Sequence, residues 1–314
     1  MVIIGGTKMS NIARKIVLTV ADNKLVTKFV NKYGLTLGAS RFVAGENLED
    51  TIKAVKQLNA KGIYATLDNL GESCHDERVA REGTKEAIRI LEAIQESGVK
   101  STLSVKLTQL GLDIDYNFCL NNMMEIIGKA NELNNFVEVD MEDSSKVDAT
   151  IGIFRELKEK YPQNVGLALQ SYLYRTEKDM DNLADLKTSY RLMKGAYKEP
   201  KEVAYPAKKD VDDNLMKIIK KHLDAGFYTA IASHDERIIN DTKAYIKEKN
   251  IPTSQYEFQM LYGICSNLQE QLVKEGHKVR CYVPYGTDWY PYFSRRLAER
   301  PANILFILKN LFKR

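Results

Sequence analysis

The stretch FVEVDMEDSSKVDATIGIFRELKEKYPQNVGLALQ, residues 136–170, shows the pattern that decides the fold. Its two ends, 136–141 and 165–170, are short runs rich in β-branched and aliphatic residues, which predict strands. Apolar residues recur at helical spacing between them and predict an amphipathic helix. These residues are Val147, Ile151, Phe154 and Leu157. A strand, a helix and a second strand in this order are typical of a crossover between parallel strands.

The same alternation extends from Gly62 to the end of the chain. Further strand-like runs are 63–68, 101–107, 190–194, 228–233, 256–260 and 279–284. Further helical stripes are Leu120, Met123, Ile127 and Ala130; Val211, Leu215 and Ile218; and Ile238, Thr242 and Tyr245. Six strands would leave an open sheet, whereas eight favour a closed (β/α)8 barrel of the α/β class. No GxGxxG motif follows any of the strands, which removes the main support for an open dinucleotide-binding sheet.

The length of 314 residues is compatible with one barrel and a short appendage. We expect residues 63–314 to form the barrel and residues 1–62 to form a helical N-terminal arm. Within that arm Asn47 is the expected N-cap of a helix whose apolar face repeats up to Gly62. The residues of this face are Leu48, Ile52, Val55 and Leu58.

Composition excludes several classes of protein. The 46 basic and 42 acidic residues leave a net charge of +4, too balanced to indicate a nucleic-acid partner. The four cysteines show no zinc-type spacing and the four histidines form no HxxxH pair, so no metal site is expected. So few thiols in a long chain favour a reducing, cytoplasmic setting. No run of 18 apolar residues predicts a membrane span.

Polar and charged residues stand where several of the expected strands end. Parallel strands in such a barrel bring their C-terminal ends to one rim, where the chemistry occurs. A single polar residue there is usually a helix cap or a satisfied hydrogen-bonding group, so it is their concentration that indicates a site. The residues are Lys106, Asp140, Glu142, Asp143, Gln170, Arg191, Lys194, Ser233, His234 and Tyr282, and Gly195 follows Lys194 directly.

Arginines at two places each allow two interpretations. Arg191 falls inside an expected buried strand, where it needs either an anionic ligand or a carboxylate from a neighbouring strand. Arg295 and Arg296 together can grip a ligand carboxylate, or one of them can pair with Glu299 on a helix surface. The stretch 195–209 contains two prolines and no helical stripe, and a loop of that length is often functional.

Two signatures in the second half of the chain resemble those of a known family. RLMKGAY at 191–197 is similar to its RLxKGAY signature, and YVPYG at 282–286 followed by YxxRRxxE at 292–299 is similar to its closing signature. The family is that of the flavin-dependent proline dehydrogenases, and the resemblance is closest to its monofunctional bacterial members. It covers roughly residues 40–310, with segments 104–107, 138–142 and 233–234 in matching order. Ser233 stands where members commonly have Thr, and it keeps the hydroxyl group.

The resemblance implies a distorted (β/α)8 barrel that oxidises L-proline to Δ1-pyrroline-5-carboxylate with FAD and passes electrons to a membrane quinone. Arg295, Arg296 and Lys106 are implied to bind the proline carboxylate. Tyr282 is implied to pack on the proline ring, and it matches members that prefer proline over 4-hydroxyproline. Asp140 is implied to be an active-site carboxylate, and Arg191 to lie near N5 of the flavin. The residues implied to hold FAD are Met141, Gln170, Arg191, Lys194, Gly195, Ala196, Ser233 and His234.

Two other functions are compatible with such a rim. A Schiff-base aldolase would use Lys106 or Lys194 as its nucleophile, with a pKa lowered by neighbouring cations. An aldolase for neutral sugars would not need the arginine pair. A carboxylate-binding barrel without catalytic activity would bind the same ligands and show no turnover.

The last residues, 304–314, form an apolar segment with basic residues at its end. One interpretation is a terminal helix docked on the barrel, and the other is an anchor that contacts the membrane surface. Quinone reduction would give the anchor a purpose, at the inner face of the membrane.

The anchor hypothesis predicts that deletion of residues 304–314 lowers binding to anionic vesicles and leaves flavin binding intact. Basic and apolar residues together favour an anionic lipid surface. Co-sedimentation with anionic and with neutral vesicles measures the effect. Equal binding of the full and shortened chains would reject the anchor.

Overall fold

The computed structural model describes residues 41–299 of the chain, with side chains up to Ser294. Eight parallel strands follow one another in chain order and close into a barrel, because β1 pairs with both β2 and β8. The strands are β1 Tyr64–Asn69, β2 Ser101–Val105, β3 Val137–Val139, β4 Val165–Gln170, β5 Tyr190–Met193, β6 Thr229–Ala232, β7 Tyr256–Leu261 and β8 Val279–Tyr285. The expected (β/α)8 barrel is therefore confirmed.

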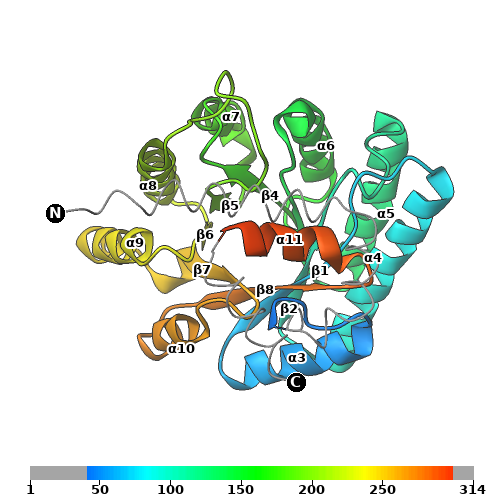
Figure 1. Ribbon diagram of the computed structural model, residues 1–314, viewed down its shortest axis with the longest axis horizontal. Helices are drawn as coiled ribbons and strands as arrows, with labels where there is room; N and C mark the ends of the chain where they lie inside the picture. Colours follow the sequence, from blue (N-terminus) through cyan, green and yellow to red (C-terminus); the bar gives the residue numbers. More distant parts are fainter. Residues whose placement is uncertain (1–40, 300–314) are drawn as a thin grey trace.

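Helices alternate with the strands and surround them (Figure 1). The α-helices are α3 Leu48–Ala60, α4 Glu77–Ser97, α5 Tyr116–Glu132, α6 Val147–Lys160, α7 Thr176–Asn182, α8 Lys208–Asp224, α9 Glu236–Lys249, α10 Ser266–Lys274 and α11 Trp289–Glu299. Short 3₁₀ turns are η2 Ser144–Lys146, η3 Ala184–Leu186 and η4 Thr253–Gln255. The four apolar stripes that predicted helices fall within α5, α6, α8 and α9.

The expected strand bounds differ from the observed ones by a few residues. The largest difference is at β3, expected over 136–141 and observed as Val137–Val139. Here the chain leaves the strand ladder after Val139, and Asp140 and the residues that follow it enter the loop at the rim. The expected loop over 195–209 is correct except at its end, because α8 already begins at Lys208.

The first and last described helices depart from a regular barrel. Asn47 caps α3 as expected, since its side chain accepts a hydrogen bond from the Asp50 N–H. α3 packs on β1 and β8, the outer position that a regular barrel gives to the helix after its last strand. α11 instead lies across the centre of the barrel in Figure 1, and its Trp289 and Phe293 pack with Leu70, next to the end of β1.

The helical N-terminal arm over residues 1–62 stays a prediction, because residues 1–40 lie outside the described residues. The same holds for the apolar tail over 304–314.

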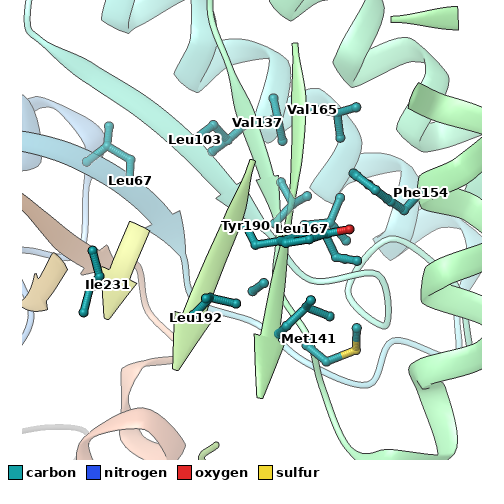
Figure 2. Packing of buried hydrophobic residues seen from close by; sticks show 14 of the residues in the cluster. Leu67, Leu103, Val137, Met141, Phe154, Val165, Leu167, Tyr190, Leu192 and Ile231 are labelled. Atoms are coloured by element: carbon teal, nitrogen blue, oxygen red, sulfur yellow. The ribbon is translucent and has the colours of Figure 1, made fainter. Parts of the chain in front are cut away.

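The main hydrophobic core lies between the strands and the surrounding helices. Figure 2 shows outward-facing strand residues such as Val137, Val165 and Leu167 gathered near Phe154 of α6. Phe154 and these three residues are fully buried. Strands buried on both faces are expected to be apolar outward, where helices cover them.

The inside of the barrel is polar instead. Inward-facing side chains of distant strands meet there, as in the hydrogen bond from Arg191 on β5 to Ser104 on β2. The register pairs Arg191 with Ala168 on β4 and with Ala230 on β6. Because paired residues point to the same face, these small side chains leave room for the guanidinium group.

Replacing the buried Phe154 by alanine is expected to lower the free energy of unfolding by about 3–5 kcal/mol, through lost apolar burial and the cavity left behind. Urea denaturation measures this. The matched control Val79→Ala removes an apolar side chain that is 47% exposed, and a change within about 0.5 kcal/mol is expected there. Equal effects of the two substitutions would contradict the described packing.

Candidate active site

Asp140 is the centre of a buried charged cluster at the C-terminal ends of the strands. Its Oδ1 accepts hydrogen bonds from Ser104 Oγ at 2.7 Å and Arg191 Nη1 at 2.5 Å. Its Oδ2 accepts from Tyr282 Oη at 2.8 Å and Lys106 Nζ at 3.3 Å. The structure thus joins Asp140, which follows β3, and Lys106, which follows β2, to Arg191 on β5 and Tyr282 on β8. The sequence had suggested these four residues separately.

Lys106 lies between two carboxylates rather than one. Its Nζ is 3.1 Å from both carboxylate oxygens of Asp68, at the end of β1, and it also contacts Asp140. Sequence reasoning did not identify Asp68 as a site residue. The rule that placed Lys106 at the rim could have found it, since Asp68 ends the first expected strand.

The electrostatics of the cluster follow from burial and close opposite charges. Burial opposes ionisation of Asp140, but Lys106 and Arg191 outweigh it and lower the pKa of this carboxyl group. Burial alone would lower the pKa of Lys106, yet the neighbouring acidic groups, led by Asp68, raise it well above the ordinary value. Asp140 is therefore a carboxylate and Lys106 an ammonium group at neutral pH.

Arg191 is held from three sides. Its Nη1 donates to Asp140 and to Ser104 Oγ at 3.0 Å, and its Nε donates to Gln259 Oε1 at 2.8 Å. Its guanidinium carbon lies 5.3 Å from the centre of the Tyr282 ring. Of the two partners expected for Arg191, a carboxylate is thus present, but it follows β3, which is not adjacent to β5.

Gln259 is a second residue that sequence reasoning missed, and its amide orientation is determined by its neighbours. Its Nε2 donates to Glu257 Oε1 at 2.7 Å, so its oxygen faces Arg191. Glu257 is in turn fixed by Arg280, whose Nε lies 2.6 Å from the same carboxylate oxygen. In the sequence, Glu257 and Gln259 alternate with apolar residues along β7, and this alternation indicates that one face of the strand is polar.

Apart from Met141, which follows β3, and Arg191, inside β5, the residues that resemblance suggested for cofactor binding lie at the end of β4 and directly after β5 and β6. Gln170 donates from Nε2 to the Glu142 carbonyl at 2.7 Å, and its Oε1 accepts from the Ala196 N–H at 3.4 Å. Ser233 Oγ accepts from the Asp235 N–H at 3.1 Å. His234 Nε2 accepts from the Leu261 N–H at 2.9 Å.

Lys194 and Gly195 follow β5 directly. Lys194 Nζ pairs with Asp212 at 2.5 Å and with Asp235 at 2.8 Å. Gly195 has a φ of +118°, and a Cβ there would lie 2.3 Å from the ring of Tyr172. Only glycine satisfies both constraints. The side chain of Met141, by contrast, is buried in the hydrophobic core (Figure 2).

The arginine pair belongs to α11, whose backbone includes Arg295 and Arg296. Their side chains lie outside the described part of the chain, so their proposed contact with a substrate carboxylate stays a prediction. α11 itself packs over the strand ends through Trp289 and Phe293.

Two further findings concern the described residues 41–299 as a whole. Within that range no group of three or more histidine, cysteine or acidic side chains is arranged to hold a metal ion. No described helix combines the length and the apolar character needed to cross a membrane.

The position of Gln259 predicts that Gln259→Leu lowers the free energy of unfolding by about 1–3 kcal/mol, because Arg191 Nε loses its buried acceptor. Urea denaturation measures the change. Gln271→Leu is the matched control, since it removes an amide whose hydrogen bond to Glu275 is exposed. Equal, small changes for both variants would show that the bond to Arg191 is unimportant.

Comparison with known proteins supports the same identification over nearly the whole chain. The family model described as proline dehydrogenase matches residues 51–308. Proline dehydrogenase 1 of Bacillus subtilis strain 168 is 45% identical over 301 residues, which are 96% of this chain and 99% of that protein. The proline dehydrogenase of Deinococcus radiodurans is 45% identical over 304 residues, covering 96% of this chain and 98% of the relative.

A solved structure shows the same fold. Proline utilization A from Bdellovibrio bacteriovorus, inactivated by N-propargylglycine, superposes with a TM-score of 0.82 at 23% identity. The match covers 93% of this chain, which spans 37% of that longer chain. The matched family model and the identity to monofunctional relatives lead to one conclusion: this chain belongs to the proline dehydrogenase family.

Proposed function

We propose that this chain oxidises L-proline to Δ1-pyrroline-5-carboxylate, with FAD as the hydride acceptor and a quinone as the final electron acceptor. Membership of the family makes it an enzyme of proline catabolism. The observation that carries the finer proposal is the cluster of Lys106, Arg191 and Tyr282 around the buried Asp140 carboxylate.

The substrate would be held by its two chemically distinct parts. Proline has a carboxylate, for which Lys106 and the arginines Arg295 and Arg296 are the proposed partners. It also has an apolar ring, for which the aromatic face of Tyr282 is suited. Because Tyr282 and Lys106 are both bound to Asp140, these two contacts keep a constant spacing.

The residues at the end of β4 and after β5 and β6 are the proposed site of a flavin dinucleotide. The amide of Gln170, the N–H of Ala196 and the hydroxyl of Ser233 are the kinds of group that would bind the polar edge of a flavin ring and a ribityl chain. In the structure Ala196 N–H donates to Gln170 Oε1 and Asp235 N–H donates to Ser233 Oγ, so the flavin would exchange or extend these bonds. Arg191 joins these residues to the charged cluster. Lys194, Gly195 and His234 would also hold FAD, whereas Met141, whose side chain is buried in the hydrophobic core, would offer only backbone groups.

When bound, FAD would supply the acceptor for the hydride from a ring carbon of proline, and the proton lost from the ring nitrogen would go to solvent. The protein contributes position and charge. Lys106 and Tyr282 orient the ring, which supplies much of the rate enhancement for such a transfer. Arg191 places a permanent positive charge beside the cofactor, where negative charge accumulates during reduction. Asp140 keeps these groups in place.

The Schiff-base alternative is not supported by the environment of the lysines. A nucleophilic lysine needs a lowered pKa, whereas the acidic neighbours of Lys106 raise its pKa well above the ordinary value. Lys194 is paired with two carboxylates, from Asp212 and Asp235. We further propose that the protein is cytoplasmic and that residues 304–314 contact the membrane surface, where the quinone is reduced.

The visible spectrum tests the proposed cofactor and substrate together. The purified protein is expected to be yellow, and L-proline without oxygen is expected to bleach it. Borohydride is expected to trap no substrate adduct on a lysine. A colourless protein that neither binds added FAD nor oxidises proline would reject the proposal.

Lys106→Met tests the role of the charged cluster. It is expected to raise KM for proline by about 10–100-fold, since a hydrogen bond to a charged group contributes about 1.5–3 kcal/mol. The flavin spectrum should be retained. Lys53→Met, which changes a lysine with a 73% exposed side chain, is the control and should leave KM unchanged. Equal KM values for both variants would exclude Lys106 from the substrate site.

A further inference from the structure

A cavity of about 400 Å³ opens at the N-terminal end of the barrel, on the side of Arg191 away from the rim. Its inner wall includes inward-facing residues of β3, β5, β7 and β8. These are Glu138, Arg191, Glu257, Gln259 and Arg280. Its outer wall includes Lys158, Lys187, Tyr228 and Lys278. Among the lining residues, Arg191 is the one that also belongs to the proposed substrate or cofactor contacts.

Glu138 is the unusual residue of this wall. Its relative exposure is 6%, and its Oε1 is buried without a hydrogen-bond partner among the described residues. The cations around it already have partners. Arg280 and Lys278 pair with Glu257, at 2.6 and 3.2 Å, and Arg191 donates to Asp140 and Gln259. A buried carboxylate oxygen left without a donor is strongly unfavourable.

The ion pairs inside the described part of the barrel point to the same residue. The inward-facing carboxylates are Asp68, Glu138, Asp140 and Glu257. Four cations pair with three of them: Lys106 with Asp68 and Asp140, Arg191 with Asp140, and Arg280 and Lys278 with Glu257. Among these four carboxylates Glu138 is the one without an ion pair.

Burial also raises the pKa of Asp68, so the hydrogen bonds have to distinguish the carboxyl group that carries a proton. Asp140 accepts from two cations, and Glu257 accepts from Arg280 with both of its oxygens. Both oxygens of Asp68 accept from Lys106. A proton on Glu138 therefore removes the unpaired charge without breaking an ion pair.

All groups that face Glu138 have to be considered for its titration. Burial raises the pKa of Glu138 to about 7. Arg191 on β5 and Arg280 on β8 oppose this rise, and Asp140 after β3 and Glu257 on β7 add to it. Lys158 on α6 and Tyr228 before β6 also interact with its charge. The positive groups do not lower the pKa of Glu138 to the ordinary value of a glutamate.

We propose that Glu138 holds an exchangeable proton behind Arg191 and that the N-terminal cavity connects this proton to solvent, which makes Glu138 a positioning residue for the charge at the cofactor site. The proposal rests on the proposed function for its effect on the flavin. The titration of Glu138 itself does not depend on that function.

The charge on Glu138 would affect the cofactor site through Arg191. Burial works to lower the pKa of this guanidinium group, and the charges of Glu138 and then Asp140 outweigh it. When Glu138 is ionised, a second negative charge partly cancels the positive charge of Arg191. When Glu138 is protonated, the full positive charge is available to the cofactor. A bound metal cation would neutralise Glu138 equally well, but the basic residues of the cavity wall oppose it.

The first test measures how the stability of the folded protein changes with pH, and it does not depend on bound flavin. A pKa of about 7 in the folded state, against an ordinary 4.5, means that the folded protein binds the proton more tightly, so stability falls as pH rises between these values. The wild-type urea midpoint should fall relative to that of Glu138→Gln across this range. Glu132→Gln, whose side chain is 65% exposed, should follow the wild type. Parallel profiles of wild type and Glu138→Gln would overturn the proposal.

A second measurement uses the wild-type protein, in case the variant does not fold. NMR of protein labelled with ¹³C at glutamate carboxyl groups should show one carboxyl that titrates near pH 7. Titration of every glutamate below about pH 5.5, as for ordinary glutamates, would overturn the proposal. A midpoint that moves with sodium or potassium concentration at constant ionic strength would show a bound cation instead, and would also overturn it.

The third test measures whether protonation of Glu138 changes the midpoint potential of the bound flavin. The midpoint potential of the bound flavin should agree between wild type and Glu138→Gln below pH 6, where both are neutral at this position. Above about pH 8 the wild-type potential should be the lower one, because an anion behind Arg191 disfavours negative charge on the cofactor. A Glu138 that titrates without any difference in potential would remove the positioning role. Absence of flavin would reject the proposed function, while the first two tests would still stand.

Discussion

The buried carboxylate of Asp140 is the interaction on which the rest of the barrel interior depends. Lys106 and Arg191 are cations with little access to water, and such groups are tolerated only when paired and hydrogen-bonded. Asp140 pairs with both, one on each carboxylate oxygen, and also accepts from Tyr282. Because these partners come from the ends of different strands, one carboxylate determines how the residues at the rim face one another.

A barrel filled with charges obtains its apolar stabilisation elsewhere. The inward-facing positions that flank Arg191 are Ala168 and Ala230, which make space for a long polar side chain rather than contribute burial. Outward-facing residues such as Val165 and Leu167 pack beneath the helices and form the main core. The outward faces of the strands therefore provide the apolar stabilisation, and the inward faces of the same strands carry the polar residues of the site.

Much of the candidate site could be predicted from sequence because parallel strands align their ends. That rule places Lys106, Asp140 and Tyr282 on one rim without knowledge of any contact. The same rule extends to Asp68, which ends the first expected strand. Gln259 lies inside an expected strand, where the rule for strand ends does not apply and where helix-covered strands are expected to be apolar on both faces. The alternation of Glu257 and Gln259 with apolar residues along β7 indicates a polar interior.

The sequence by itself determined the order of strands and helices, the cap of α3 and the residues that stand at the strand ends. These features depend on neighbours along the chain, through helical periodicity and local backbone preferences. Only the tertiary structure decided which charges meet, that Lys106 is shared by two carboxylates, and that Glu138 is left with an unpartnered oxygen. These outcomes depend on the closure of β1 against β8 and on distances across the barrel, and no local pattern specifies either of them.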